Sequence, residues 1–169
     1  MNLHIVEWAN LLANGQLEIP LGERSLIMPG TAATGDPLLS NGKLGADIIR
    51  VPAGQGFLPH THPGDHLLIV IGGQGTIVYD GRIYPTRAGQ IYMIEGKVPH
   101  AVGAITDHVI IAVGSPHKAV DAPDRMSLVE YQAVTTDMSV LYCLICEREA
   151  ELPIRLHDKK CPHCPCGEC

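Results

Sequence analysis

The chain has 169 residues, a formal net charge of −6 and a hydrophobic content of 46%. This length suits one medium domain with a sizeable core plus a small appendage. The acidic balance argues against a nucleic-acid partner, which would need a basic face, and no run approaches the roughly 18 apolar residues of a membrane span. One Trp and one Phe leave an aliphatic core, and 18 glycines with 13 prolines predict many turns, as in a many-stranded β protein.

The first predicted element is a short helix from Ile5 to Asn14, with apolar residues at near-helical spacing and Gly15 at its end. Residues 20–44, rich in Gly, Pro, Ser and Thr, are expected to be looped or extended, with a strand at Ser25–Met28. The N-terminus lacks the basic region and apolar run of a signal peptide, so we expect a cytoplasmic protein.

Short strands follow, separated by turn signals. Asp80-Gly81 between two β-type runs is a strong hairpin signal. Pro116 and Pro123 mark a linker before a last strand. The expected strands are Ala46–Val51, Leu67–Ile71, Thr76–Tyr79, Arg82–Tyr84, Gln90–Ile94, Val109–Val113 and Ser127–Val134. Strands this short, without intervening helices, indicate a jelly-roll barrel.

Four histidines form the strongest functional motif. His60, His62 and His66 are separated by even spacings, which on an extended strand can place all three imidazoles on one side. His100, which follows Pro99, would complete the set from a distant strand. Imidazole suits zinc, copper, iron and nickel, so the pattern predicts a metal site. Asp65 has the wrong parity for this face and is expected to be a turn residue or an outer hydrogen-bond acceptor.

The glycines around these histidines carry a family resemblance. Gly54, five residues, His60-x-His62, three residues, His66, six residues and Gly73 resemble the first motif of the cupin superfamily. Gly81, five residues, Arg87-x-Gly89 and then Pro99-His100 resemble the second. The usual cupin has Glu where this chain has His66, and usually Pro at Arg87. The sequence is therefore most similar to small single-domain cupins with four histidines, some of them manganese proteins.

This resemblance implies an all-β cupin fold, a double-stranded β-helix or jelly-roll barrel, and cupins similar to this one are often homodimers. Candidate pocket residues are Tyr84, Tyr92 and Arg50, although each can equally be a core, surface or edge residue. We expect Arg87 in a surface turn.

All six cysteines lie in the last 27 residues. Cys143-Leu-Ile-Cys146 and Cys161-Pro-His-Cys164 are two CxxC knuckles separated by fourteen residues, a spacing typical of a four-thiolate zinc or iron site. Redox-active or disulfide-bonded CxxC pairs are the alternative, which a reducing cytoplasm disfavours. Cys166 and Cys169 are spare or alternative ligands.

The tail resembles the rubredoxin-like or zinc-ribbon-like tail of bacterial 3-hydroxyanthranilate 3,4-dioxygenases, although the Glu ligand of those enzymes has no counterpart here. We expect residues 1–135 to form the barrel with its N-terminal helix, and residues 136–169 to form a four-cysteine module of structural role.

The expected function is that of a metal-dependent oxygenase acting on a small organic molecule. His60, His62, His66 and His100 would hold Fe(II) or Mn(II), with Ni, Cu or Zn as alternatives. An isomerase or lyase that uses the metal only as a Lewis acid, and a non-catalytic small-molecule-binding protein, are the other two hypotheses.

Overall fold

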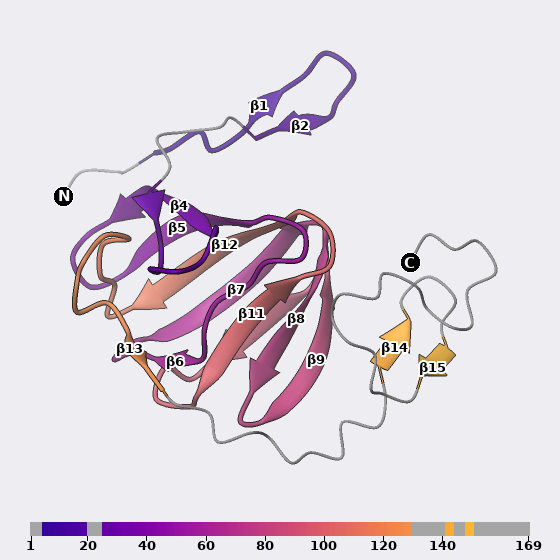
Figure 1. Cartoon of the computed structure of the whole chain (residues 1–169). Helices are drawn as coiled ribbons and strands as arrows, with labels where there is room; N and C mark the ends of the chain where they lie inside the picture. Colours follow the sequence, from indigo (N-terminus) through magenta and orange to yellow (C-terminus); the bar gives the residue numbers. More distant parts are fainter. Residues whose placement is uncertain (1–4, 20–24, 130–140, 144–147, 151–169) are drawn as a thin grey trace.

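The computed structural model describes residues 5–19, 25–129, 141–143 and 148–150. In this part of the chain all regular structure is β, so no helix there is long and apolar enough to cross a membrane. The strands form two larger antiparallel sheets that face each other (Figure 1). This is the expected jelly-roll arrangement.

The larger sheet has six strands in the order β10-β7-β12-β5-β4-β3. Its strands are β3 (Ser25–Leu26), β4 (Thr34–Ser40), β5 (Gly45–Val51), β7 (Asp65–Gly72), β10 (Ile91–Ile94) and β12 (His108–Ser115). β12 pairs with both β5 and β7, so it occupies the middle of the sheet. Its residues alternate between buried and half-buried, as expected for a strand with one face on the core.

The smaller sheet has five strands in the order β13-β6-β11-β8-β9. Its strands are β6 (His60–Thr61), β8 (Gln74–Tyr79), β9 (Arg82–Arg87), β11 (His100–Ala104) and β13 (Ser127–Leu128). The predicted hairpin is confirmed: β8 and β9 pair across Asp80 and Gly81, whose φ angles of 48° and 76° are those of a tight hairpin turn. Both sheets contribute aliphatic residues to one core, among them Val70, Ile77 and Ile110.

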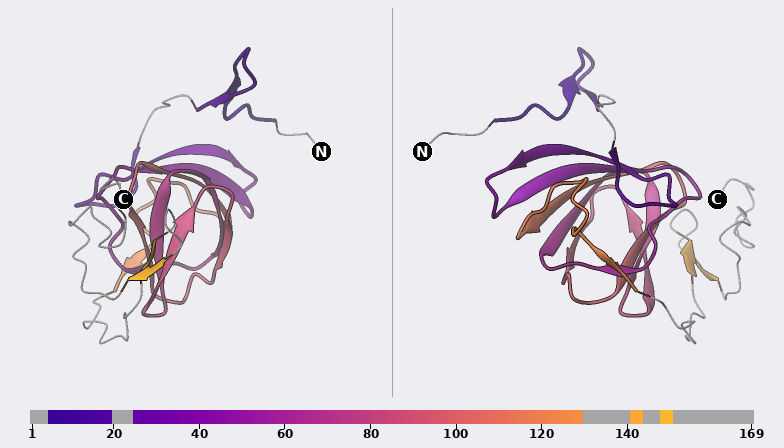
Figure 2. Two further views of the ribbon diagram at one scale, coloured as in Figure 1. Left: turned by 90° about the vertical axis from the view of Figure 1, so that its right-hand side faces the viewer. Right: turned by 60° about the vertical axis from the view of Figure 1, so that its left-hand side comes forward.

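The helix predicted over residues 5–14 is wrong. Residues Asn10–Leu11 (β1) and Leu17–Glu18 (β2) pair as a small hairpin, which stands apart from the two sheets (Figures 1 and 2). Residues 13–15 form its turn: the N–H of Gly15 donates to the Leu12 carbonyl at 2.9 Å, and Gly15 adopts a φ of 80°, as in three-residue hairpin loops with a glycine in the left-handed region. Ile5 and Leu11 remain 81% and 74% exposed. A helix this short would be marginal without an apolar face to bury.

Residues 20–44, expected to be looped or extended with a strand at Ser25–Met28, include β3 at Ser25–Leu26 and a second extended strand, β4, that the sequence pattern did not single out. Pro37 lies inside this strand at a shift of register against β5, and a bulge is one of the few places where a strand accepts proline. The last predicted strand is shorter than expected within the described residues, since β13 covers only Ser127–Leu128. Residues 130–134 of that prediction lie outside the described part.

The cysteine tail contributes two described strands. β14 (Leu141–Cys143) and β15 (Arg148–Ala150) pair as an antiparallel hairpin. The side chain of Cys143, and residues Cys146, Cys161 and Cys164 altogether, lie outside what the structure describes, so the four-thiolate site stays a prediction.

Candidate metal centre

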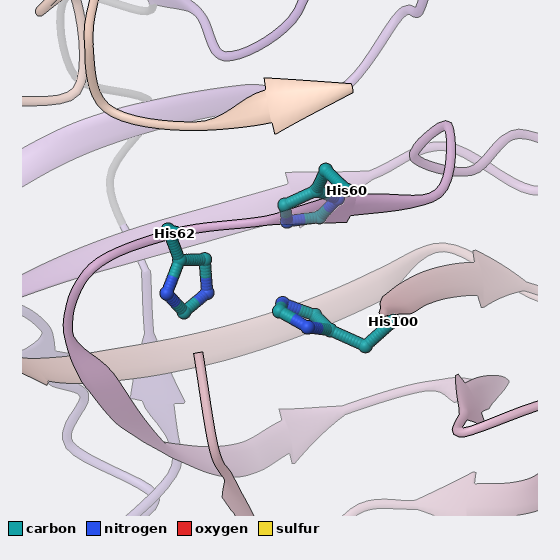
Figure 3. A group of neighbouring side chains, drawn as sticks. All are labelled: His60, His62 and His100. Carbon is teal, nitrogen blue, oxygen red and sulfur yellow. The ribbon is translucent and has the colours of Figure 1, made fainter. Parts of the chain in front are cut away.

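Three histidines converge between the two sheets. His60 of β6 lies directly opposite His100 of β11 in the antiparallel register, and His62 is on the same side as His60 because strand side chains alternate. The ring centroids are 4.4 Å apart for His60 and His100 and 4.6 Å for His62 and His100. One nitrogen from each ring lies within 4.8 Å of the others (Figure 3).

A backbone carbonyl fixes the tautomer of each ring. The Nδ1 atoms of His60, His62 and His100 lie 2.8, 2.5 and 2.7 Å from the carbonyl oxygens of Leu58, Gly64 and Val98 respectively. A carbonyl oxygen can only accept, so each Nδ1–H donates and each Nε2 keeps its lone pair. This is the arrangement that orients histidine ligands on metals.

His62 provides the test of whether these residues fit a metal. Its Nε2 is buried and has no hydrogen-bond partner among the described residues. An unsatisfied buried acceptor is costly, and a metal ion would satisfy it. His60, His62 and His100 are 5%, 7% and 3% exposed. The buried triad therefore fits a divalent metal.

Two glycines make room for the histidine rings. A Cβ at Gly96 would fall inside contact distance of Nδ1 of His62 and of the Gly64 carbonyl. The carbonyl of Gly96 accepts the backbone N–H of His62 at 2.8 Å, and its own N–H donates to Asp65 at 3.0 Å. Asp65 is thus a turn-stabilising acceptor, as expected. A Cβ at Gly114 would approach the ring of His66 to 2.7 Å.

His66 lies beside the triad and does not converge with it. It belongs to β7 in the other sheet, and its ring stacks on that of His62 with centroids 4.1 Å apart and an interplanar angle of 25°. It lines the same cavity, but its nitrogens are not part of the compact triad. Its role as a fourth ligand therefore stays a prediction.

Burial keeps these imidazoles neutral. It lowers the pKa of His60 to about 3, with a further contribution from the nearby His100. It lowers the pKa of His62 to about 4 and that of His66 to about 3, and it lowers the pKa of His100 as well. Metal ligation requires the neutral ring, which all four histidines offer at neutral pH.

The cavity beside the triad is small and mainly apolar. Its volume is about 30 Å³, room for an ion and about one or two water-sized ligands. Ile27, Phe57, Leu68 and Ile110 supply part of its wall. No acidic side chain is among the described residues that line it.

The three predicted pocket residues lie elsewhere. Arg50 pairs with Asp36 at 2.5 Å. Tyr84 is 41% exposed on β9, and the Tyr92 hydroxyl donates to Oε1 of Gln90 at 2.6 Å. None of them lines the cavity. Arg87 is exposed at the end of β9, and its carbonyl accepts the N–H of Gln90 at 3.2 Å, so it opens a surface turn as expected.

Sequence reasoning missed Arg125. It lies in the segment between β12 and β13, lines the cavity, and has a side chain only 7% exposed. Its sequence neighbours, Asp124 and Met126, give no signal for this position, because an arginine next to an aspartate in a Pro-containing linker is expected on the surface. Only the return of this segment over the barrel brings Arg125 inside.

Comparison with known protein families finds a match in the part of the chain that carries the three histidines. Residues 47–114 match the family model described as "Cupin domain". The matched residues are therefore similar to a cupin domain, and they include the buried three-histidine cluster that can bind a metal. No curated protein sequence matches the chain significantly.

Solved structures support the fold alone. KdgF from Halomonas sp. is 19% identical with a TM-score of 0.52, over 57% of this chain and 87% of that one. An RmlC-like cupin from Shewanella frigidimarina is 23% identical with a TM-score of 0.52, over 59% and 90%. The EutQ protein of Clostridium difficile is 20% identical with a TM-score of 0.51, over 68% and 90%.

Proposed function

We propose that this protein is a metal-dependent cupin oxygenase, in the manner of a dioxygenase, whose substrate is a small organic molecule. The observation that carries the proposal is the buried triad of His60, His62 and His100, with each Nδ1–H tied to a carbonyl and the Nε2 of His62 left without a described partner. His66 would be a fourth ligand after a rotation of its ring away from His62. A bound Fe(II) or Mn(II) would supply Lewis acidity and one-electron chemistry.

The chain's own residues prepare the site for that chemistry. Neutral imidazoles leave the full charge of a divalent ion uncompensated, which favours an anionic ligand. The carbonyl contacts at Leu58, Gly64 and Val98 hold the rings in one orientation without rearrangement. Apolar walls such as Phe57 and Leu68 limit the access of water.

The second candidate is an isomerase or lyase, and the position of His66 is the observation that favours it. A histidine beside the metal that is not a ligand could move a substrate proton. However, burial lowers the pKa of His66 to about 3, and a group this weakly basic is a poor general base at neutral pH. No other acid–base side chain outside the histidines and Arg125 lines the cavity in the described part of the chain, so we place the oxygenase first.

For the tail we propose a structural zinc or iron site held by Cys143, Cys146, Cys161 and Cys164. The spacing of the two knuckles supports it.

Metal content and oxygen consumption together test the proposal. Purified full-length protein, stripped and reconstituted separately with Fe(II), Mn(II) and Zn(II), is assayed by elemental analysis and with an oxygen electrode against a panel of small organic acids, enols and diketones. We expect one barrel metal per chain and substrate-dependent oxygen uptake with Fe(II) or Mn(II). The double variant His60→Ala/His62→Ala should lose both.

His108→Gln is the matched control, because it changes a buried histidine that does not line the cavity. It should keep the barrel metal. Turnover of the same substrates under argon would contradict the oxygenase hypothesis and support the lyase or isomerase. Failure of the wild-type barrel to retain any divalent metal would refute all metal-dependent chemistry at this site.

A further inference from the structure

Arg125 places a buried positive charge on the wall of the histidine cavity. Its side chain is 7% exposed, and it lines the cavity together with the four histidines. Its positive charge contributes to lowering the pKa of His60, His62 and His66. Arginine is almost never fully buried unless it is paired, so each nitrogen of this guanidinium needs an account.

One end of the guanidinium is paired and the other is not. Nη2 donates to Oδ2 of Asp47 on β5 at 2.9 Å. Nη1 is buried and has no hydrogen-bond partner among the described residues. Asp47 thus anchors the guanidinium through Nη2, while Nη1 remains available to a further acceptor. Buried polar groups without hydrogen-bond partners are rare in folded proteins.

The charges around the cavity point to an anion. Asp47 neutralises Arg125, and the described lining contains no acidic side chain to neutralise a divalent ion held by neutral histidines. Two unmet groups therefore share this site, a hydrogen-bond donor on Arg125 and a lone pair on His62. A metal would satisfy the lone pair on Nε2 of His62. An anion that reaches both the metal and Nη1 would neutralise charge on the metal and accept the hydrogen bond from Nη1.

We propose that Nη1 of Arg125 binds the carboxylate of the substrate, so that the substrate class of this protein is a small organic acid. This inference rests on the function proposed above and narrows it. Because Nη2 is already engaged, the contact is through one nitrogen and not the usual two-nitrogen fork. The cavity of about 30 Å³ restricts the acid to a small one or requires its remainder to extend toward the open side.

A purely structural role is the competing explanation. The ion pair with Asp47 ties the segment before β13 to β5, and a water molecule would then satisfy Nη1. The two explanations differ in a measurable way, since a water-filled site does not discriminate between a carboxylate and a neutral amide of the same shape, whereas an anion site does.

The test measures binding of acetate and propionate, with acetamide and propionamide as neutral counterparts. Full-length protein is titrated in its metal-free and its Zn(II)-loaded forms, by calorimetry and by NMR of the arginine side-chain resonances. Three proteins are compared: wild type, Arg125→Lys, which keeps the positive charge but has no second nitrogen in the position of Nη1, and the neutral double variant Arg125→Met/Asp47→Asn.

We expect wild type to bind each carboxylate about tenfold or more tightly than its amide, as for a hydrogen bond to a charged group. Both variants should retain zinc. In the metal-free form they should lose that preference, and in the zinc-loaded form they should show a smaller preference than wild type, because the metal itself still favours an anion. Equal affinity for acid and amide in wild type, or an unchanged preference in Arg125→Lys, would overturn the inference. If the protein binds no zinc but metal-free wild type still prefers the acids, the metal function fails and the role of Arg125 stands.

Discussion

Asp47 and Arg125 form a buried ion pair that joins β5 to the segment before β13. Oδ2 and Nη2 are 2.9 Å apart, and the two side chains are 1% and 7% exposed. Oδ1 of Asp47 also lies 3.3 Å from Nε2 of His117. The pair therefore ties the segment before β13 to β5 and fixes one end of a guanidinium whose residue also lines the histidine cavity.

Asp47→Asn should destabilise the protein strongly. It leaves the Arg125 charge buried without its counterion, which costs about 3–5 kcal/mol of unfolding free energy. Arg125→Met/Asp47→Asn should recover part of this loss, because it removes both charges together. Urea denaturation of wild type, the single variant and the double variant measures the difference. A double variant no more stable than Asp47→Asn would mean that the buried charge is not the cause.

Gly96→Ala should weaken metal binding at the triad. The added methyl group would collide with the ring of His62 and with the Gly64 carbonyl that orients it, so we expect a loss of metal affinity of about 10–100-fold, as for removal of an outer-shell partner. Competition with a chelator measures this affinity.

Gly72→Ala is the matched control, because its Cβ would meet Val109 at 3.5 Å, an ordinary contact. Equal loss of metal affinity in the two variants would contradict the steric explanation.

His66→Glu and His66→Ala test whether His66 ligates the metal or only stacks on His62. If His66 ligates the metal, a glutamate in its place adds a negative charge beside the metal and should weaken azide binding. We expect about a tenfold loss of azide affinity, which corresponds to about 1.4 kcal/mol. Alanine should keep partial metal affinity through the remaining three imidazoles. The measurement is an azide titration of wild type, His66→Glu and His66→Ala, each loaded with the same metal. Identical azide affinities at full metal occupancy would show that His66 only stacks on His62.

His108 should make the protein less stable in acid. Burial lowers its pKa, and its ring contacts Oγ1 of Thr86 and the Gly72 carbonyl, each at 3.0 Å. In the unfolded chain the pKa of His108 is about 6.5. Below that pH the unfolded state binds a proton on this ring, whereas the folded state, in which the pKa is lower, does not. Stability from this residue is complete above about pH 6.5 and falls as the pH drops, by up to about 1.4 kcal/mol per unit.

His108→Gln should flatten this part of the pH dependence. It should also cost about 1–3 kcal/mol at pH 7.5, because buried partners lose their hydrogen bonds. Urea denaturation between pH 5 and 8 gives both values. A variant with the same decline in acid as wild type would assign the decline to other groups, such as the four cavity histidines.

Cys143→Ser/Cys146→Ser should release the tail metal and leave the barrel metal in place. A thiolate site contributes folding free energy to its own small module, and the barrel triad draws on none of these cysteines. Elemental analysis of the variant should show one metal fewer per chain. Loss of both metals would mean that the tail supports the barrel directly or through a dimer contact.

The even spacing of His60 and His62, the Pro-His at position 100 and the Asp80-Gly81 turn are local patterns. They act through strand alternation and turn geometry, which is why the sequence by itself predicted the barrel and the three converging histidines. It predicted neither the inward position of Arg125 nor the outward position of Tyr84. These follow from which segments lie side by side after the chain has closed around its core.

The same physics explains the missing helix over residues 5–14 and the ring orientation of His66. Apolar spacing favours a helix only where a surface covers it, and Ile5 and Leu11 find none. Parity places His66 on the inner face of β7, but its ring angle depends on the room left by Gly114 and on the stacked ring of His62. Side-chain identity and strand period are properties of the sequence, whereas the direction in which a buried ring or guanidinium points is decided by neighbours far away along the chain.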